Sequence, residues 1–386
     1  MAQKRKLTIV CVGADLIPDK LGGAEKHAIE VINRLAKTHK ILLFVGSDTS
    51  IKTFIPKTVE IFPVVYPKIP NLFGISYIIF GFFQIRRILA ARHFDLLWAK
   101  QTYPQAPLAV LLKMTLKRPV YVTAQNPMLH QEELVIKGKV LVPLQRFLAG
   151  LLTPLISWSL SRSDVVAAVS NYSANLAKKM GAKKVVIIPN GVDLSRFKPK
   201  PRSKIKKFTI VTTSSLIPRN GVDTLIDAVA LLSKDIDWQL LIAGDGPKEL
   251  SLKAQSLKLK LTNKIKFLGR VNNSKIPQLL AKADIFVRPS RQEGFGVSFL
   301  EALAAGVPVI ATPVGGILDF IHHKKTGLLV TPDDPKELKD AIELLIQNNN
   351  LKRSLVKNGI QLVNKKYHWK KIASQIEAQF YHLINQ

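Results

Sequence analysis

Two carboxylates, Glu293 and Glu301, stand around a glycine turn in the stretch PSRQEGFGVSFLEALAAGVPVIATPVGG. Apolar residues after the turn recur at helical spacing, and Gly306 and Pro308 end the pattern. The sequence therefore predicts a short helix that begins at Gly294-Phe295-Gly296, where free backbone N–H groups and the helix dipole favour an anion. Glu301 would lie about one turn deeper, roughly 5 to 6 Å further along the axis. A carboxylate there suits the paired hydroxyls of a ribose, and Glu293 suits those of a sugar.

Ordinary helix capping is the alternative interpretation of these two carboxylates. Acidic residues near the start of a helix are favoured by the helix dipole alone. The bare spacing therefore leaves both interpretations open.

The chain around this motif alternates strand-like apolar runs with amphipathic stretches, which predicts an α/β fold with parallel sheets. In the first half, strands are expected at 7–13, 41–45, 96–99, 120–124, 165–169 and 185–188, and helices at 24–38, 75–91, 105–116 and 173–180. In the second half, strands are expected at 208–211, 239–243, 265–268, 285–288 and 309–311, and helices at 221–233, 276–283, around Glu301 and at 369–384.

A basic stretch separates the two sets. Residues 194–207 hold two prolines and seven Lys or Arg without an acidic residue, which favours an exposed, charged linker. We therefore expect one domain at 1–193, a linker at 194–207, a second domain at 208–366 and a terminal helix at 367–386.

Composition indicates a globular protein of 386 residues, 47% hydrophobic, with a single cysteine, Cys11. One cysteine makes no disulfide framework, so a reducing cytoplasm is expected. The short apolar run that contains Cys11 predicts a first β-strand and not a signal peptide.

The formal net charge is +30, and the excess is spread evenly over the two halves. Such a charge fits nucleic acid or an anionic membrane surface, although a lysine-rich proteome would also account for it. No nucleic-acid-binding motif accompanies the charge, so no nucleic acid is expected as a partner.

Two apolar segments favour the membrane surface. Leu72–Phe83 is followed by Arg86 and Arg87, and Val140–Leu160 contains Arg146 and two prolines. The first segment is too short to span a bilayer and the second is interrupted. We expect interfacial helices; buried helices with snorkelling arginines are the alternative.

Further motifs are less specific. Gly22-Gly23 follows the first strand and opens a helix, so its N–H groups could face a phosphate, but no dinucleotide fingerprint follows Gly13. Asp235 and Asp237 have a metal-binding D-x-D spacing, but they precede a strand in what reads as a surface turn. No metal site is expected.

The longer pattern E-G-F-G-x-x-x-L-E-A-x-A-x-G-x-P-V-I-A, followed by G-G and T-G-L-L-V, resembles the donor-binding half of the family-four retaining glycosyltransferases. P-N-G-V-D at 189–193, G-D-G-P at 244–247 and F-L-G-R-V at 267–271 resemble further segments of that family. The resemblance implies a GT-B fold: two Rossmann-like parallel-sheet domains facing a cleft. The N-terminal domain would bind the acceptor, the C-terminal domain the nucleotide sugar, and the last helix would pack back on the first domain.

The resemblance also implies the site residues. Glu293 and Gln125 would be catalytic, contacting the donor sugar near the reacting centre. The donor-binding residues would be Gly22, Gly23, Ser215, Arg219, Asn220, Gly244, Gly269, Val271, Gly294, Phe295, Gly296, Val297 and Glu301. No cofactor and no metal would be required.

Three positions depart from the family pattern. The family has Arg and Lys where this chain has Ser215 and Asn220, and commonly His at the position of Gln125. A phosphate contact without the Lys loses its charge-assisted part, on the order of 1 to 2 kcal/mol. Arg219 lies next to the vacated position. In such retaining enzymes the leaving phosphate itself would deprotonate the acceptor, so loss of the His need not abolish transfer.

The resemblance implies metal-independent, retaining transfer of a hexose from a nucleotide diphosphate sugar. Basicity and the apolar segments favour a lipid-linked or cell-envelope saccharide acceptor and a cytoplasmic protein, peripheral on the inner face of the plasma membrane. A GT-B protein that binds sugar nucleotides without turnover, or a sugar-nucleotide epimerase on the same fold, are the alternatives.

Overall fold

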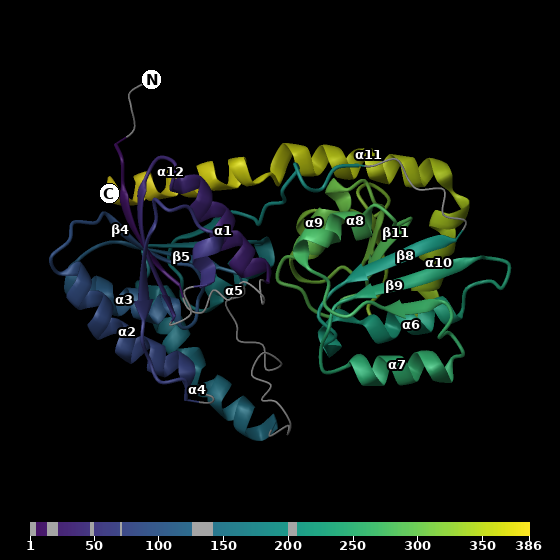
Figure 1. Cartoon of the computed structure of the whole chain (residues 1–386), viewed down its shortest axis with the longest axis horizontal. Helices are drawn as coiled ribbons and strands as arrows, with labels where there is room; N and C mark the ends of the chain where they lie inside the picture. Colours follow the sequence, from purple (N-terminus) through teal and green to yellow (C-terminus); the bar gives the residue numbers. More distant parts are fainter. Residues whose placement is uncertain (1–4, 14–21, 47–49, 70–71, 126–141, 200–206) are drawn as a thin grey trace. The chain divides into compact units, whose positions relative to one another are not determined.

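The computed structural model describes residues 5–13, 22–46, 50–69, 72–125, 142–199 and 207–386 (Figure 1). The chain forms two compact units: Met1–Asn190 with Trp369–Gln386, and Gly191–His368. Residues 200–206 of the expected linker, Val140 and Leu141 of the second apolar segment, and the side chain of its Arg146 lie outside what the structure describes. In the part of the linker that is described, Phe197 is buried.

The first unit is built on a parallel sheet in the order β3-β2-β1-β4-β5-β6-β7. Its strands are β1 (Thr8–Val12), β2 (Lys40–Gly46), β3 (Glu60–Val64), β4 (Leu96–Ala99), β5 (Val120–Ala124), β6 (Val165–Ala168) and β7 (Val185–Ile187). All but β3 are predicted by the sequence. Pro63 weakens the sequence pattern of β3 because proline has no backbone N–H to donate within a sheet. The strand lies at the sheet edge, where this missing donor can face solvent.

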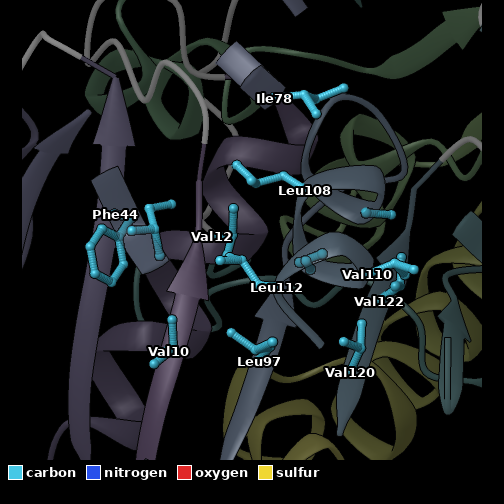
Figure 2. Packing of buried hydrophobic residues seen from close by; sticks show 14 of the residues in the cluster. Val10, Val12, Phe44, Ile78, Leu97, Leu108, Val110, Leu112, Val120 and Val122 are labelled. Carbon is cyan, nitrogen blue, oxygen red and sulfur yellow. The ribbon is translucent and has the colours of Figure 1, made fainter. Parts of the chain in front are cut away.

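Helices cover both faces of this sheet. They are α1 (Gly23–Leu35), α2 (Phe73–Leu89), α3 (Gln105–Leu116), α4 (Val142–Arg162), α5 (Asn171–Lys179) and α12 (Trp369–Ile384), with a 3₁₀ turn at Ser50–Thr53. On one face, α2 and α3 pack on apolar strand residues (Figure 2). Val12 and Leu97 lie there near Leu108 and Leu112 of α3, and Val122 lies beside Val110 of the same helix.

The helix α12, predicted at the same bounds, packs on the opposite face of this sheet beside α1. The Phe380 ring meets the Tyr121 ring edge-on with centroids 4.9 Å apart, and Trp369 lies against His27 at 5.7 Å. The last helix therefore completes the core of the first unit, although the whole second unit intervenes in the sequence.

The second unit repeats the plan with a parallel sheet in the order β10-β9-β8-β11-β12-β13. Its strands are β8 (Phe208–Thr213), β9 (Trp238–Ala243), β10 (Ile265–Phe267), β11 (Ile285–Arg288), β12 (Val309–Ala311) and β13 (Leu328–Leu329). Only the two-residue edge strand β13 is not predicted by the sequence.

The helices of this unit are α6 (Val222–Ala230), α7 (Glu249–Lys258), α8 (Ile276–Leu280), α9 (Val297–Ala304), α10 (Pro335–Gln347) and α11 (Asn349–Lys366), with 3₁₀ turns at Pro218–Asn220, Asn273–Lys275 and Gly315–Asp319. The sequence patterns predict α6, α8 and α9 but miss α7, α10 and α11. Apolar residues of α6, α10 and the strands share one core, among them Leu225, Ile242 and Ile342.

Each sheet has a point at which the strand order reverses. In the first unit β1 lies between β2 and β4, and in the second unit β8 lies between β9 and β11. Loops that leave the carboxyl ends of the two strands at such a point diverge, and ligands of doubly wound sheets bind there. The motifs at Gly22-Gly23 and at 293–301 follow β1 and β11.

Candidate functional site

Four loops meet at the carboxyl edge of the second sheet, after β8, β9, β11 and β12. Backbone hydrogen bonds join them: Leu216 N–H to the Asp245 carbonyl at 2.8 Å, Arg291 N–H to Arg219 at 2.7 Å, and Gly316 N–H to Glu293 at 3.3 Å. The loops therefore hold one another in place, and the sequence motifs that they carry lie together.

Glycines allow this close approach. Gly221, with φ +66°, lies against Pro289, and a Cβ at this position would overlap the Pro289 carbonyl oxygen. Gly315, with φ +56°, lies in the same way against the Glu293 carbonyl oxygen. Both positions combine left-handed backbone with a neighbouring main chain, so only glycine fits.

The predicted glycine turn opens α9, with Gly296 as N-cap residue at φ +94°. The carboxylate of Glu293 turns back over this turn: Oε1 accepts the N–H of Gly294 at 3.0 Å and that of Phe295 at 3.4 Å. The region in which the sequence predicts an anion therefore holds the carboxylate of Glu293. Val297 follows as the first residue of the helix.

Glu301 is the fifth residue of α9 and is 7% exposed. Its position one turn inside the helix is the one predicted. A carboxylate this deep in a protein needs compensating charge, and its charge acts on the guanidinium of Arg288.

Arg288, which the sequence analysis does not select, is the central cation of this edge. It ends β11, is 7% exposed and pairs with the Glu293 carboxylate. Burial and the nearby Arg219 lower the pKa of Arg288 to about 9, whereas Glu301 raises it. A charged residue at the end of the apolar run IFVR, directly before the glycine turn, is the signal that could have identified it.

The loop after β8 carries Ser215 and Asn220, which stand where the family has Arg and Lys, and Arg219, which lies next to Asn220. The Asn220 amide donates to the Ser215 carbonyl at 2.7 Å and is 7% exposed, so Asn220 closes the loop. The Ser215 residue is exposed, and Arg219 is half-buried and electrostatically coupled to Arg288. Of the three, only Arg219 carries a charge.

The loop after β9 completes the edge. Gly244 N–H donates to the Gly269 carbonyl at 2.8 Å, which ties together two of the predicted donor-binding segments. Gly244 has φ +146°, and a Cβ there would overlap the Ser214 carbonyl oxygen. Gly269 and Val271 are half-buried after β10.

The Gly22-Gly23 motif of the first unit lies at the start of α1, as predicted. Glu25 Oε2 accepts the Gly22 N–H at 3.1 Å, and its Oε1 accepts the Gln101 amide at 3.1 Å. The amine of Lys100, 1% exposed, lies 3.8 Å from Oε1. Lys100, like Arg288, directly follows an apolar strand run, and the sequence analysis does not select it.

Gln125 lies at the carboxyl end of β5, also in the first unit. Its amide forms a reciprocal pair with Asn190: Gln125 Nε2 donates to Oδ1 at 3.1 Å, and Asn190 Nδ2 donates to Gln125 Oε1 at 2.8 Å. The Asn190 side chain is buried. The P-N-G-V-D turn therefore fixes the orientation of the Gln125 amide.

The D-x-D motif lies at the opposite edge of the second sheet. Asp237 directly precedes β9 at its amino end, and its carboxylate is 3.6 Å from the Lys207 amine. In the described part of the chain, no three His, Cys, Asp or Glu residues are grouped as a metal site would require.

Comparisons with known proteins agree with this architecture. The family model for "Glycosyltransferase Family 4" matches residues 21–196, and that for "Glycosyl transferases group 1" matches residues 194–362. An uncharacterized glycosyltransferase of Methanocaldococcus jannaschii is 28% identical over 91% of this chain and 92% of its own length. The lipopolysaccharide core biosynthesis mannosyltransferase LpsB of Rhizobium meliloti is 32% identical over 59% of this chain and 69% of its own length.

Among solved structures, Anabaena HepE in complex with UDP-glucose superposes with a TM-score of 0.80 at 22% identity, covering 98% of this chain and all of HepE. The expected two-domain α/β architecture is thereby confirmed. Together with the two family matches and the LpsB relationship, it shows that the chain is a glycosyltransferase and belongs to family four, with the GT-B fold.

Proposed function

We propose that this glycosyltransferase moves a hexose, with retention, from a nucleotide diphosphate sugar to a saccharide or lipid-linked acceptor. The observation that carries the donor assignment is the buried Glu301, one turn inside α9 and beside the four joined loops. Its carboxylate would accept hydrogen bonds from the ribose hydroxyls. Glu293 would accept those of the sugar.

The diphosphate would lie near the glycine-lined loops, where Arg219 provides positive charge. Gly244 and the segment from Gly269 to Val271 would contact the nucleotide. Catalysis would rest on positioning and on electrostatic stabilisation of the leaving diphosphate. We propose that no metal takes part, as in the family that the chain resembles; the D-x-D motif lies away from the joined loops.

A donor screen tests this assignment. Thermal shift is measured with UDP, GDP, ADP and their hexose conjugates. A ligand at 100 times its Kd should stabilise the folded state by about 2.7 kcal/mol. We expect one nucleotide to give this shift, and its conjugate to be consumed when acceptor is added. The proposal fails if no nucleotide shifts the transition.

A binding protein without turnover is the second candidate. It is favoured by the side chains that stand where the family has Lys and His. The Asn220 amide is hydrogen-bonded to the Ser215 carbonyl, and the Gln125 amide is hydrogen-bonded to Asn190. Binding in the donor screen without hydrolysis or transfer, over a panel of lipid-linked acceptors, would favour it.

For the acceptor side we propose an anionic membrane surface. No helix in the residues that the structure describes is long and apolar enough to cross a bilayer. One face of α2, however, exposes Phe73, Ile79, Phe80 and Phe83 to 46%, 51%, 44% and 67%. Arg86 and Arg87 continue this face in the last turn and are also exposed. An apolar half followed by a basic half suits the boundary between acyl chains and anionic headgroups.

The relative LpsB is named for lipopolysaccharide core biosynthesis, which supports a cell-envelope acceptor. An enzyme with such an acceptor would work at the inner face of the plasma membrane. In the second apolar segment, Trp158 of α4 is half-buried and packs on the core of the first unit, so the proposed membrane surface rests on α2.

Vesicle flotation tests the α2 surface. The unmodified protein should float with vesicles that contain anionic lipid at low salt, and Phe80→Ser/Phe83→Ser should reduce the bound fraction several-fold. Leu250→Ser/Leu257→Ser on α7 is the matched control, because these leucines are 81% and 67% exposed outside this surface. The proposal fails if both double variants lose the same part of the vesicle-bound fraction, or if the unmodified protein does not bind the vesicles.

A further inference from the structure

Arg288 is a buried guanidinium with a partner on each arm. Nε donates to Ser290 Oγ at 3.1 Å, Nη1 donates to Ser298 Oγ at 2.8 Å, and Nη2 pairs with Glu293. The guanidinium carbon also lies 4.6 Å from the centre of the Phe299 ring. The side chain thereby joins the end of β11 to the loop and to the first turn of α9.

Both oxygens of Glu293 are held: Oε2 pairs with Arg288, and Oε1 accepts the N–H groups of Gly294 and Phe295. The carboxylate nevertheless keeps some contact with solvent. The Glu293 side chain is 19% exposed, whereas that of Arg288 is 8% exposed. A planar guanidinium holds a carboxylate in a defined orientation, which an ammonium does not do as well. Arg288 is therefore placed to act on a ligand through Glu293.

The positive charge of Arg288 also affects the electrostatics of the four loops at the carboxyl ends of the second sheet's strands. Two carboxylates, Glu293 and Glu301, lie near a region proposed to receive a diphosphate, and like charges there would repel it. Ser215 and Asn220 bring no positive charge. Arg288 and Arg219 are close enough for their charges to interact, so β11 and the β8 loop together supply the cations.

We propose that Arg288 is a positioning residue for the donor sugar: it orients Glu293 toward the sugar hydroxyls and offsets the two carboxylates of the site. The inference rests on the proposed function, because it requires that Glu293 contacts the sugar of a nucleotide diphosphate sugar. It adds a residue from β11 that neither the motif nor the family pattern selects.

The test separates the sugar from the rest of the donor. Calorimetry gives the Kd of the best nucleoside diphosphate and of its hexose conjugate for the unmodified protein, Arg288→Met and Arg288→Lys. We expect Arg288→Met to weaken binding of the conjugate about 10-fold more than binding of the diphosphate. Arg288→Lys should restore part of that difference, because it keeps the charge but not the planar geometry.

Arg291→Met is the matched control. Arg291 lies three residues after Arg288, in the loop that follows β11, and pairs with Asp223 and Asp333 instead of Glu293. Its substitution should leave the ratio of the two Kd values within twofold of the unmodified protein. Glu293→Gln should lower the affinity for the conjugate in the same way as Arg288→Met, and the double variant should add little to either.

Different results overturn different statements. If Arg288→Met weakened binding of the diphosphate and of the conjugate by the same factor, Arg288 would have only a structural role. If Arg288→Met did not fold, Arg288→Lys and Glu293→Gln decide: an unchanged ratio of the two Kd values in both variants would lead to the same conclusion. Either outcome leaves the proposed reaction and donor class standing, and the second would also remove the sugar contact proposed for Glu293. Failure of the unmodified protein to bind any nucleotide would overturn the proposed function together with this inference.

Discussion

The glycine-rich helix starts of the two units have the same parts in different arrangements. At each, a buried cation follows or ends a strand, a glutamate lies beside it, and that glutamate accepts a glycine N–H: Lys100 and Glu25 in the first unit, Arg288 and Glu293 in the second. Glu25, however, belongs to its helix, whereas Glu293 precedes its helix.

The fifth residue of each helix marks the functional difference. In α9 it is Glu301, a carboxylate kept beside the charge of Arg288. In α1 it is His27, packed edge-on against Trp369, and burial together with Lys100 lowers the pKa of His27 to about 3. The second helix start thus keeps a charged acceptor near its binding loops, while the first uses the same position for core packing.

The largest expected difference between the two helix starts lies in the backbone conformation of their glycines. Gly296 has φ +94° and a Cβ there would crowd the Phe299 ring, whereas Gly22 has φ −82° and a Cβ would meet only the tip of Glu25. We expect Gly296→Ala to destabilise the second unit by about 2 to 4 kcal/mol and Gly22→Ala the first by less than about 1 kcal/mol. Urea unfolding followed by hydrogen exchange measures both, and similar costs would mean that the two starts are equivalent.

The next effect concerns ligand affinity. Glu301→Ala should raise the Kd of the nucleoside diphosphate about 10- to 100-fold, equivalent to roughly 1.5 to 3 kcal/mol, because two hydroxyls lose a charged acceptor. His27→Ala at the matching position of α1 should leave that Kd within twofold. Calorimetry on both variants decides, provided that circular dichroism shows each to be folded. An unchanged Kd for Glu301→Ala would end the ribose assignment.

A smaller effect should appear with pH in the first unit. His27 has a lowered folded-state pKa of about 3 against 6.5 for the ordinary group, so below pH 6.5 the unfolded chain binds a proton that the folded unit does not. The free energy of unfolding should therefore fall as pH decreases, by about 1 to 2 kcal/mol between pH 6.5 and 5. Hydrogen exchange of β1 amides measures it. His27→Leu should flatten that slope, and an equal slope in this variant would assign the loss to other groups.

Local patterns predict most of the elements. Apolar runs identify every described strand except β3, which contains a proline, and β13, which has only two residues; both lie at sheet edges. The helices α7, α10 and α11 escape prediction, although α10 has an N-cap at Asp334 and an apolar face. Apolar strands, at sheet centres and at the edges β7 and β10, are encoded by adjacent residues. A two-residue strand, a strand with a proline and half-exposed helices depend instead on their neighbours in the fold.

By itself, the sequence determined the two α/β units, the glycine turn with Glu293 and Glu301, and the family that these motifs indicate. The tertiary structure alone decided that α12 completes the first core, that Asn190 holds Gln125, and that Arg288 lies against Glu293. Motifs and periodicity are properties of neighbouring residues in the chain. The pairing of a buried charge depends instead on which strand ends and loops the sheet order brings together, and this is fixed only when the chain folds.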